Sequence, residues 1–131
     1  MKSKTDMQPS QNRKQKLARW GELKAAEELL RRGYQVLQSN FRTPYGEIDL
    51  VAKKNDCLLF VEVKTRSSWL FGYPEQAVDA RKSLHLVQCA EWYIQNNPST
   101  AASFQIDVAA LTVNPKNWEE FSVEWFENAI S

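Results

Sequence analysis

Histidine and cysteine are scarce in this chain of 131 residues, which contains one histidine, His85, and two cysteines, Cys57 and Cys89. Two cysteines without CxxC spacing are too few for a disulfide framework, and a single histidine argues against a His/Cys zinc site. No stretch approaches the ~18 apolar residues that indicate a membrane span, and the basic N-terminus lacks the apolar core of a signal peptide. We therefore expect a cytoplasmic protein with reduced thiols and no membrane partner.

An excess of one charge is also missing, because 17 Lys and Arg residues stand against 16 Asp and Glu residues. With 43% hydrophobic and 25% charged residues, the composition excludes collagen-like, low-complexity and wholly disordered chains. The charge is nevertheless uneven: residues 1–32 hold nine basic and four acidic residues, whereas residues 117–131 hold four glutamates and no cation. A basic end of this kind is typical of a surface that faces a polyanion, and for the first dozen residues a solvated tail is the favoured alternative.

The chain divides into a flexible basic arm over residues 1–12 and a single domain over residues 13–131, without internal repeats. Small and apolar residues recur at steps of three and four from Arg13 to Arg32, which predicts a helix that ends at Gly33. Gly21 belongs to this stripe and precedes Glu22, so we expect the helix backbone to approach a neighbouring sheet closely there.

Apolar-rich runs predict four strands and a short candidate fifth, over residues 34–41, 47–53, 58–65, 104–113 and 121–126. The second and third runs form a hairpin, and a second helix is expected from Pro74 towards Asn97. The order helix, three strands, helix, strand predicts an α/β fold with a mixed sheet flanked by helices.

The first strand of the hairpin carries acids on one face. Side chains alternate along a strand, which places Glu47 and Asp49 on one face and Ile48 and Leu50 on the other.

The second strand of the hairpin places Phe60, Glu62 and Lys64 together on one face. If Asp49 and Glu62 lie on the same side, two carboxylates and one ammonium converge, and the carboxylates repel unless a cation intervenes. Mg²⁺ prefers such oxygen ligands and retains waters and phosphate oxygens, and Lys64 could then orient an attacking water. The alternative is a solvent-exposed sheet face with cross-strand Glu–Lys pairs.

These residues resemble the YraN-like family of small bacterial proteins. The similarity rests on Gly46-Glu47-Ile48-Asp49-Leu50 and Phe60-Val61-Glu62-Val63-Lys64-Thr65-Arg66, supported by Gly21-Glu22, Gly72, Ala77-Val78, Lys82 and Ile106-Asp107-Val108. That family resembles the PD-(D/E)xK nucleases, which have a restriction-endonuclease-like α-β-β-β-α-β core and include Holliday-junction resolvases. Ile48 stands where the superfamily signature has its proline.

The resemblance implies a nuclease-like site. Asp49 and Glu62 would be the metal ligands for Mg²⁺ or Mn²⁺, with Lys64 as the catalytic lysine and Glu22 as an additional helix acid. Glu47 is either a further ligand or an edge carboxylate paired with Arg42 or Arg66.

Three further basic residues are candidates for nucleic-acid contacts, namely Arg19, Arg66 and Lys82. Lys82 lies on a mostly apolar stripe, and its alternative role is to extend its ammonium group to water. Asp107, between Ile106 and Val108, fits a buried structural acid better than a ligand.

The sequence thus favours a metal-dependent endonuclease that hydrolyses DNA, with branched or damaged DNA as candidate substrates and a homodimer as a candidate assembly. The alternative is a nucleic-acid-binding module with this fold and no turnover. A third hypothesis is an assembly protein with a solvated polar sheet face.

Overall fold

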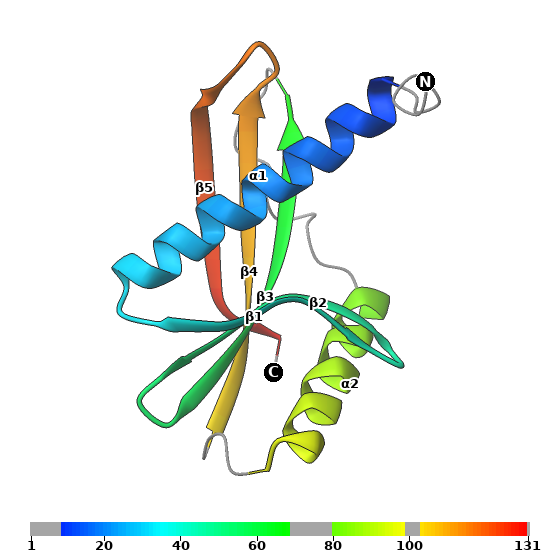
Figure 1. Ribbon diagram of the computed structural model, residues 1–131, viewed down its shortest axis with the longest axis vertical. Coiled ribbons are helices and arrows are strands. Elements are labelled where there is room, and N and C mark those ends of the chain that lie inside the picture. Colours follow the sequence, from blue (N-terminus) through cyan, green and yellow to red (C-terminus); the bar gives the residue numbers. More distant parts are fainter. Residues whose placement is uncertain (1–8, 69–79, 99–102, 131) are drawn as a thin grey trace, which may run out of the picture.

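The computed structural model describes residues 9–68, 80–98 and 103–130 and contains two helices and five strands (Figure 1). In chain order these are α1 (Pro9–Arg31), β1 (Gln35–Thr43), β2 (Gly46–Lys54), β3 (Cys57–Ser67), α2 (Ala80–Asn96), β4 (Ser103–Asn114) and β5 (Asn117–Ile130). The first helix begins at Pro9 rather than at Arg13, and it ends before Gly33, whose φ of 91° suits glycine. No helix among these residues combines the length and apolar character needed to span a bilayer.

The five strands form one mixed sheet in the order β1-β2-β3-β4-β5. Neighbouring strands are antiparallel except β3 and β4, which are parallel because the chain between them crosses over through α2. This arrangement confirms the predicted α/β fold with its α-β-β-β-α-β core. The final strand is much longer than the predicted segment 121–126, because it pairs with β4 over nearly its whole length.

The helices cover opposite faces of the sheet. Leu29 and Ala25 of α1 pack with Leu50, Val61 and other buried residues on one face. On the other face, α2 contributes a second apolar cluster, and the buried residues of that cluster are Ile48, Val51, Leu58, Phe60, Leu86, Cys89, Ala90, Tyr93, Ile106 and Ile130.

One prediction of side-chain alternation is wrong: Ile48 and Leu50 do not share a face, because Ile48 packs on the α2 side and Leu50 on the α1 side. The reason lies in the β1–β2 hairpin, which extends beyond β3 towards α2 (Figure 1). There Ile48 pairs with Phe41 of β1, and the Phe41 ring contacts Tyr93 of α2 at a centroid distance of 5.1 Å. The hairpin end therefore belongs to the α2 layer.

Helix α1 approaches β3 closely at Gly21. A Cβ atom at this position would lie 1.8 Å from Thr65 Oγ1, so only glycine fits this contact without movement. The predicted close approach of the helix backbone to the sheet is therefore confirmed. Because Glu22 is the next residue, the contact also fixes the height of its backbone above the sheet.

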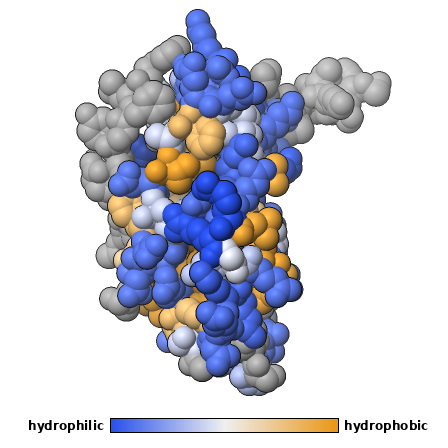
Figure 2. Space-filling view, turned by 90° about the vertical axis from the view of Figure 1, so that its left-hand side faces the viewer, coloured by the Kyte–Doolittle hydropathy of each residue, from blue (hydrophilic) through white to orange (hydrophobic). Residues whose placement is uncertain are grey.

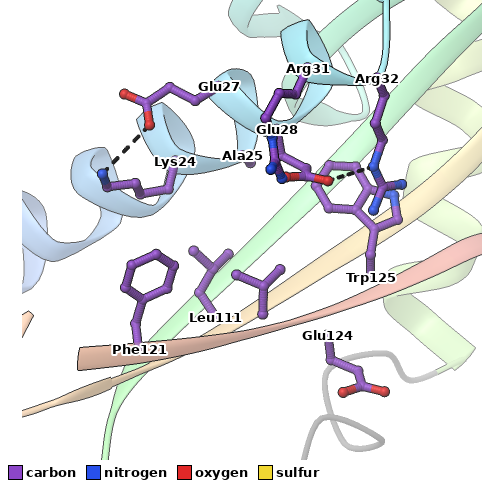
Figure 3. Close-up of a pocket in the computed structure, with 11 residues that line it drawn as sticks. Lys24, Ala25, Glu27, Glu28, Arg31, Arg32, Leu111, Phe121, Glu124 and Trp125 are labelled. Atoms are coloured by element: carbon purple, nitrogen blue, oxygen red, sulfur yellow. Dashed lines mark hydrogen bonds and ion pairs between the residues drawn. The ribbon is translucent and has the colours of Figure 1, made fainter. Parts of the chain in front are cut away.

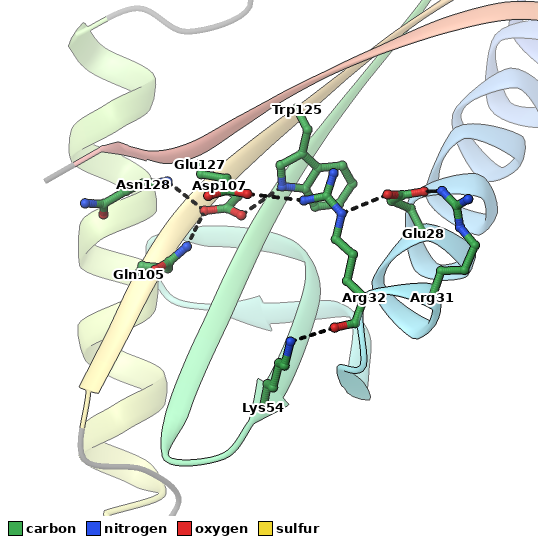
Figure 4. A network of polar contacts seen from close by, with 9 residues as sticks. All are labelled: Glu28, Arg31, Arg32, Lys54, Gln105, Asp107, Trp125, Glu127 and Asn128. Carbon is green, nitrogen blue, oxygen red and sulfur yellow. Dashed lines mark hydrogen bonds and ion pairs between the residues drawn. The ribbon is translucent and has the colours of Figure 1, made fainter.

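Asp107 of β4 is a buried, hydrogen-bonded acid, as predicted (Figure 4). Its carboxylate accepts hydrogen bonds from Trp125 Nε1 at 2.8 Å, Asn128 N at 2.8 Å and Gln105 Nε2 at 3.0 Å. The Trp125 ring in turn lies 4.5 Å from the guanidinium of Arg32. Three donors for one buried carboxylate indicate a structural role, which is to hold the end of β5 against β4.

Candidate functional site

Strands β2 and β3 separate where the predicted acids lie. Their paired register ends at Leu50 and Val61, and the next position of that register would set Asp49 beside Glu62. In place of a further ladder step, Val63 N donates a 2.8 Å hydrogen bond to Asp49 Oδ2. The fork between the strands therefore fixes the Asp49 side chain next to the strand that carries Glu62.

A hollow of about 270 Å³ opens at this fork, between the β1–β2 hairpin and α2. Three of the predicted site residues line it: Glu47, Asp49 and Glu62. Glu62 is buried, with 6% of its surface exposed, whereas Asp49 is half-buried and Glu47 is exposed. The structure thus brings the two predicted metal ligands and the candidate third acid into one cavity.

The electrostatics of the hollow are unfavourable for the bare carboxylates. Burial, followed by the charge of Glu62, raises the pKa of Asp49 from 3.8 to about 7. Glu22 and Glu47 act in the same direction, while the hydrogen bond from Val63 N opposes them. The fork therefore favours either a proton on Asp49 or a bound cation.

Glu22 reaches this region from α1. It is half-buried, accepts a 3.1 Å hydrogen bond from Asn40 Nδ2 of β1, and lies close enough to affect Asp49 electrostatically. It is not one of the described residues that line the hollow. Its position fits a supporting acid beside the pair, which is where the predicted helix acid should be.

Lys64 and Arg66 follow Glu62 along β3 at steps of two, so all three side chains leave the strand on the same side. Lys64 is half-buried and lies outside the described lining of the hollow, and Arg66 is exposed near the strand end. Glu47 had two alternatives, a metal ligand or an edge carboxylate paired with Arg42 or Arg66. No ion pair found among the described residues joins it to either arginine, although Arg42 of β1 is its direct cross-strand neighbour.

The remaining predicted contacts lie on the helices. Arg19 is exposed on α1, two residues before the Gly21 contact. Lys82 falls in the first turn of α2, and its side chain lies outside the described part of the structure.

Helix α2 contributes residues to the hollow that the sequence did not single out as site residues, chiefly His85 and Cys89. Both positions face the fork because residues four apart share a helix face. That spacing is visible in the sequence, but only the fold shows which element the face covers. Tyr45, from the turn between β1 and β2, completes the rim.

The donor set fits a hard divalent cation. Within residues 9–68, 80–98 and 103–130, no three His, Cys, Asp or Glu side chains lie close enough to hold a metal ion by themselves. Mg²⁺ does not require such a cage, since it is usually held by one or two carboxylates and completes its shell with waters and phosphate oxygens. Asp49 and Glu62, which repel each other when both are charged, are a carboxylate pair of the kind that such a cation uses.

A larger groove of about 660 Å³ lies between α1 and β5 and is distinct from this hollow (Figure 3). Its cations already have acidic partners, because Lys24 pairs with Glu27 and both Arg31 and Arg32 pair with Glu28. The surface on the β5 side is mostly hydrophilic, with smaller hydrophobic patches (Figure 2). Two of the three glutamates that line the groove, Glu27 and Glu28, are therefore already in ion pairs with cations.

Comparison with known proteins identifies one family. The model of "Uncharacterised protein family UPF0102" matches residues 21–111, a range that contains α1 from Gly21 onwards, the fork and α2. A UPF0102 protein of Caldicellulosiruptor saccharolyticus is 40% identical over 117 residues, which cover 89% of this chain and 98% of that protein. A UPF0102 protein of Syntrophomonas wolfei is 45% identical over 97 residues, or 74% of this chain and 84% of the relative.

Proposed function

The chain belongs to the UPF0102 (YraN-like) family, and from the paired carboxylates at its strand fork we propose that it is a metal-dependent endonuclease that hydrolyses DNA phosphodiester bonds. The observation that carries the proposal is the Asp49–Glu62 pair in this hollow, where burial, followed by the charge of Glu62, raises the pKa of Asp49 to about 7. Such a pair destabilises the folded protein when both carboxylates are charged, unless a bound cation offsets their repulsion.

Asp49 and Glu62 would hold Mg²⁺ or Mn²⁺, which when bound supplies Lewis acidity towards water and the phosphate oxygens. The hydrogen bond from Val63 N leaves Asp49 with a fixed orientation, so the ligand does not have to be ordered when the cation arrives. Lys64, on the same side of β3 as Glu62, would orient the attacking water and offset the negative charge that develops on the phosphate.

Basic residues on β3 and on both helices support a polyanionic substrate. Arg66 extends the charge of Lys64 towards the end of β3, and Arg19 and Lys82 lie on the two helices that cover the sheet. Contacts of this kind to phosphates position a nucleic acid without selecting a sequence. We propose DNA as the nucleic acid, with branched or damaged structures as the substrates to test first.

The test is cleavage of duplex, single-stranded and four-way-junction DNA by the full chain in Mg²⁺ and in Mn²⁺. Asp49→Asn and Glu62→Gln keep the side-chain shape but remove the charge, and each should reduce cleavage by about 100-fold or more. Glu119→Gln is the matched control, because Glu119 is exposed on β5 and does not line the hollow.

Cleavage that persists unchanged in both fork variants would place the activity elsewhere. Salt-dependent DNA binding without cleavage in either metal would instead support the non-catalytic binding module.

A further inference from the structure

Three carboxylates line the fork hollow, but it has one basic side chain among its described lining residues, that of His85. The complete described lining is Tyr45, Gly46, Glu47, Asp49, Glu62, His85, Leu86 and Cys89, with no lysine or arginine. A phosphodiester anion brought into this hollow would meet three acids. A hydrogen-bond donor in the lining itself would therefore favour its binding, in addition to any metal and to Lys64, which lies outside the described lining.

The other polar groups of the lining do not meet that need. Cys89 is buried, and its sulfur already accepts a hydrogen bond from Thr43 Oγ1 at 3.2 Å. Burial also raises the pKa of the Cys89 thiol, which keeps it neutral. Tyr45 is exposed and offers a neutral phenol.

The backbone of α2 fixes the position of His85 over the hollow. Leu86, the next residue, is only 4% exposed and packs in the apolar cluster with Ile48 and Phe60. Cys89, one turn further along, anchors the same face of the helix. The imidazole is exposed at the rim, so it can reach a ligand without breaking a packed contact.

We propose that His85 is a substrate-binding residue of this hollow, whose imidazole N–H donates a hydrogen bond to a non-bridging oxygen of a nucleic-acid phosphodiester. This rests on the proposed nuclease function and specifies what the hollow recognises. A volume of about 270 Å³ is below the usual range for pockets that enclose a drug-sized ligand, so the hollow suits one phosphate group with the sugar and base outside it.

Because His85 is the single histidine of the chain, its imidazole signals in an NMR spectrum of the untagged protein are unambiguous. The probe is a short thymidine oligonucleotide added in the presence of Ca²⁺, and the matched probe is its uncharged methylphosphonate analogue. We expect the phosphodiester to shift the His85 signals saturably and the methylphosphonate to leave them in place.

His85 signals that stay fixed while the backbone amide of Gly46 shifts would overturn this inference and leave the proposed function intact. If neither His85 nor Gly46 responds to the phosphodiester, both proposals fail.

Variants provide a second measurement. His85→Ala should weaken oligonucleotide binding in Ca²⁺ by about tenfold, the loss expected for one hydrogen bond to a charged group. His85→Gln keeps an N–H donor and should recover part of the affinity, whereas Ca²⁺ binding to the free protein should not change in either variant.

Leu84→Ala is the control, since Leu84 neighbours His85, is 58% exposed and does not line the hollow. Equal affinity of the wild type and His85→Ala for the oligonucleotide would refute the assignment.

Discussion

Gly21 of α1 lies directly against Thr65 of β3, so that a methyl group on residue 21 would fall 1.8 Å from Thr65 Oγ1. The same hydroxyl oxygen is buried and has no hydrogen-bond partner among the described residues. A poorly satisfied threonine and a glycine within a helix are both unfavourable on their own. Because Gly21 has no side chain, α1 packs directly on β3 at this point, and Glu22 is the next residue along the helix.

Gly21→Ala should therefore destabilise the protein, although alanine favours helix more than glycine by about 1 kcal/mol. We expect a net loss of about 1–3 kcal/mol in the free energy of unfolding, because the added methyl group must push α1 away from β3. Urea unfolding followed by circular dichroism measures this change. In a Thr65→Ala background part of the loss should disappear, since Oγ1 and Cγ2 are gone, whereas the Thr65 Cβ position, 2.9 Å from the added methyl group, stays occupied. A Gly21→Ala protein that is as stable as the wild type would contradict the contact.

The convergence of Asp49 and Glu62 could be anticipated from the sequence because period-two alternation is a local property of strands. Phe60 and Glu62 share a face, and Asp49 lies beside Glu62, as expected from their positions in the hairpin. The same rule failed for Ile48, since the end of the β1–β2 hairpin leaves β3 and packs on α2. Where a strand loses one neighbour, tertiary packing decides which side of the molecule its side chains face.

The extent of β5 and the position of His85 beside the hollow were not predictable for a similar reason. Exposed acids such as Glu119 and Glu124 interrupt the apolar pattern of β5, because an edge strand has few side chains that must be buried. His85 looks like a surface residue in the sequence and is indeed exposed. Only the packing of α2 against the hairpin reveals that its face of the helix borders the hollow.

The raised pKa of Asp49 predicts an unusual dependence of stability on pH in the absence of metal. The group has a pKa of 3.8 in its ordinary state and about 7 in the folded protein, so the folded state binds its proton more tightly. The contribution of Asp49 to stability is therefore largest at low pH and is lost as the pH rises from about 4 to about 7.

Between pH 5 and pH 8, the wild type should lose about 2–3 kcal/mol relative to Asp49→Asn, which has no proton to release. Urea unfolding in EDTA at the two pH values provides the comparison. If the free energy of unfolding changed equally with pH in the two proteins, the pKa of Asp49 would not be raised by folding.

Asp107 provides a contrast, because it is a buried acid whose role is to support the sheet. Asp107→Ala would leave the indole N–H of Trp125 and the backbone N–H of Asn128 without their acceptor. We expect a loss of about 2–4 kcal/mol in the free energy of unfolding, with unchanged metal affinity at the fork. Denaturation and calorimetric Mn²⁺ titration at a temperature where the variant is folded test the two parts. A variant of normal stability that no longer binds Mn²⁺ would instead identify Asp107 as a ligand.

Metal binding should reverse the pH dependence of Asp49, because a divalent cation binds the ionised carboxylates and displaces the proton. Saturating Mn²⁺ should therefore raise the melting temperature of the wild type more at pH 8 than at pH 5, where the proton competes with the metal for Asp49. The same addition to Asp49→Asn or Glu62→Gln should produce a much smaller shift at either pH, since each variant lacks one of the two charges. Glu119→Gln, with both fork acids intact, should respond like the wild type. Differential scanning calorimetry of the four proteins measures all of these shifts. An equal response of the wild type and Asp49→Asn at pH 8 would mean that the cation binds outside the fork. The proposed cation would then not be the group that offsets the repulsion between Asp49 and Glu62.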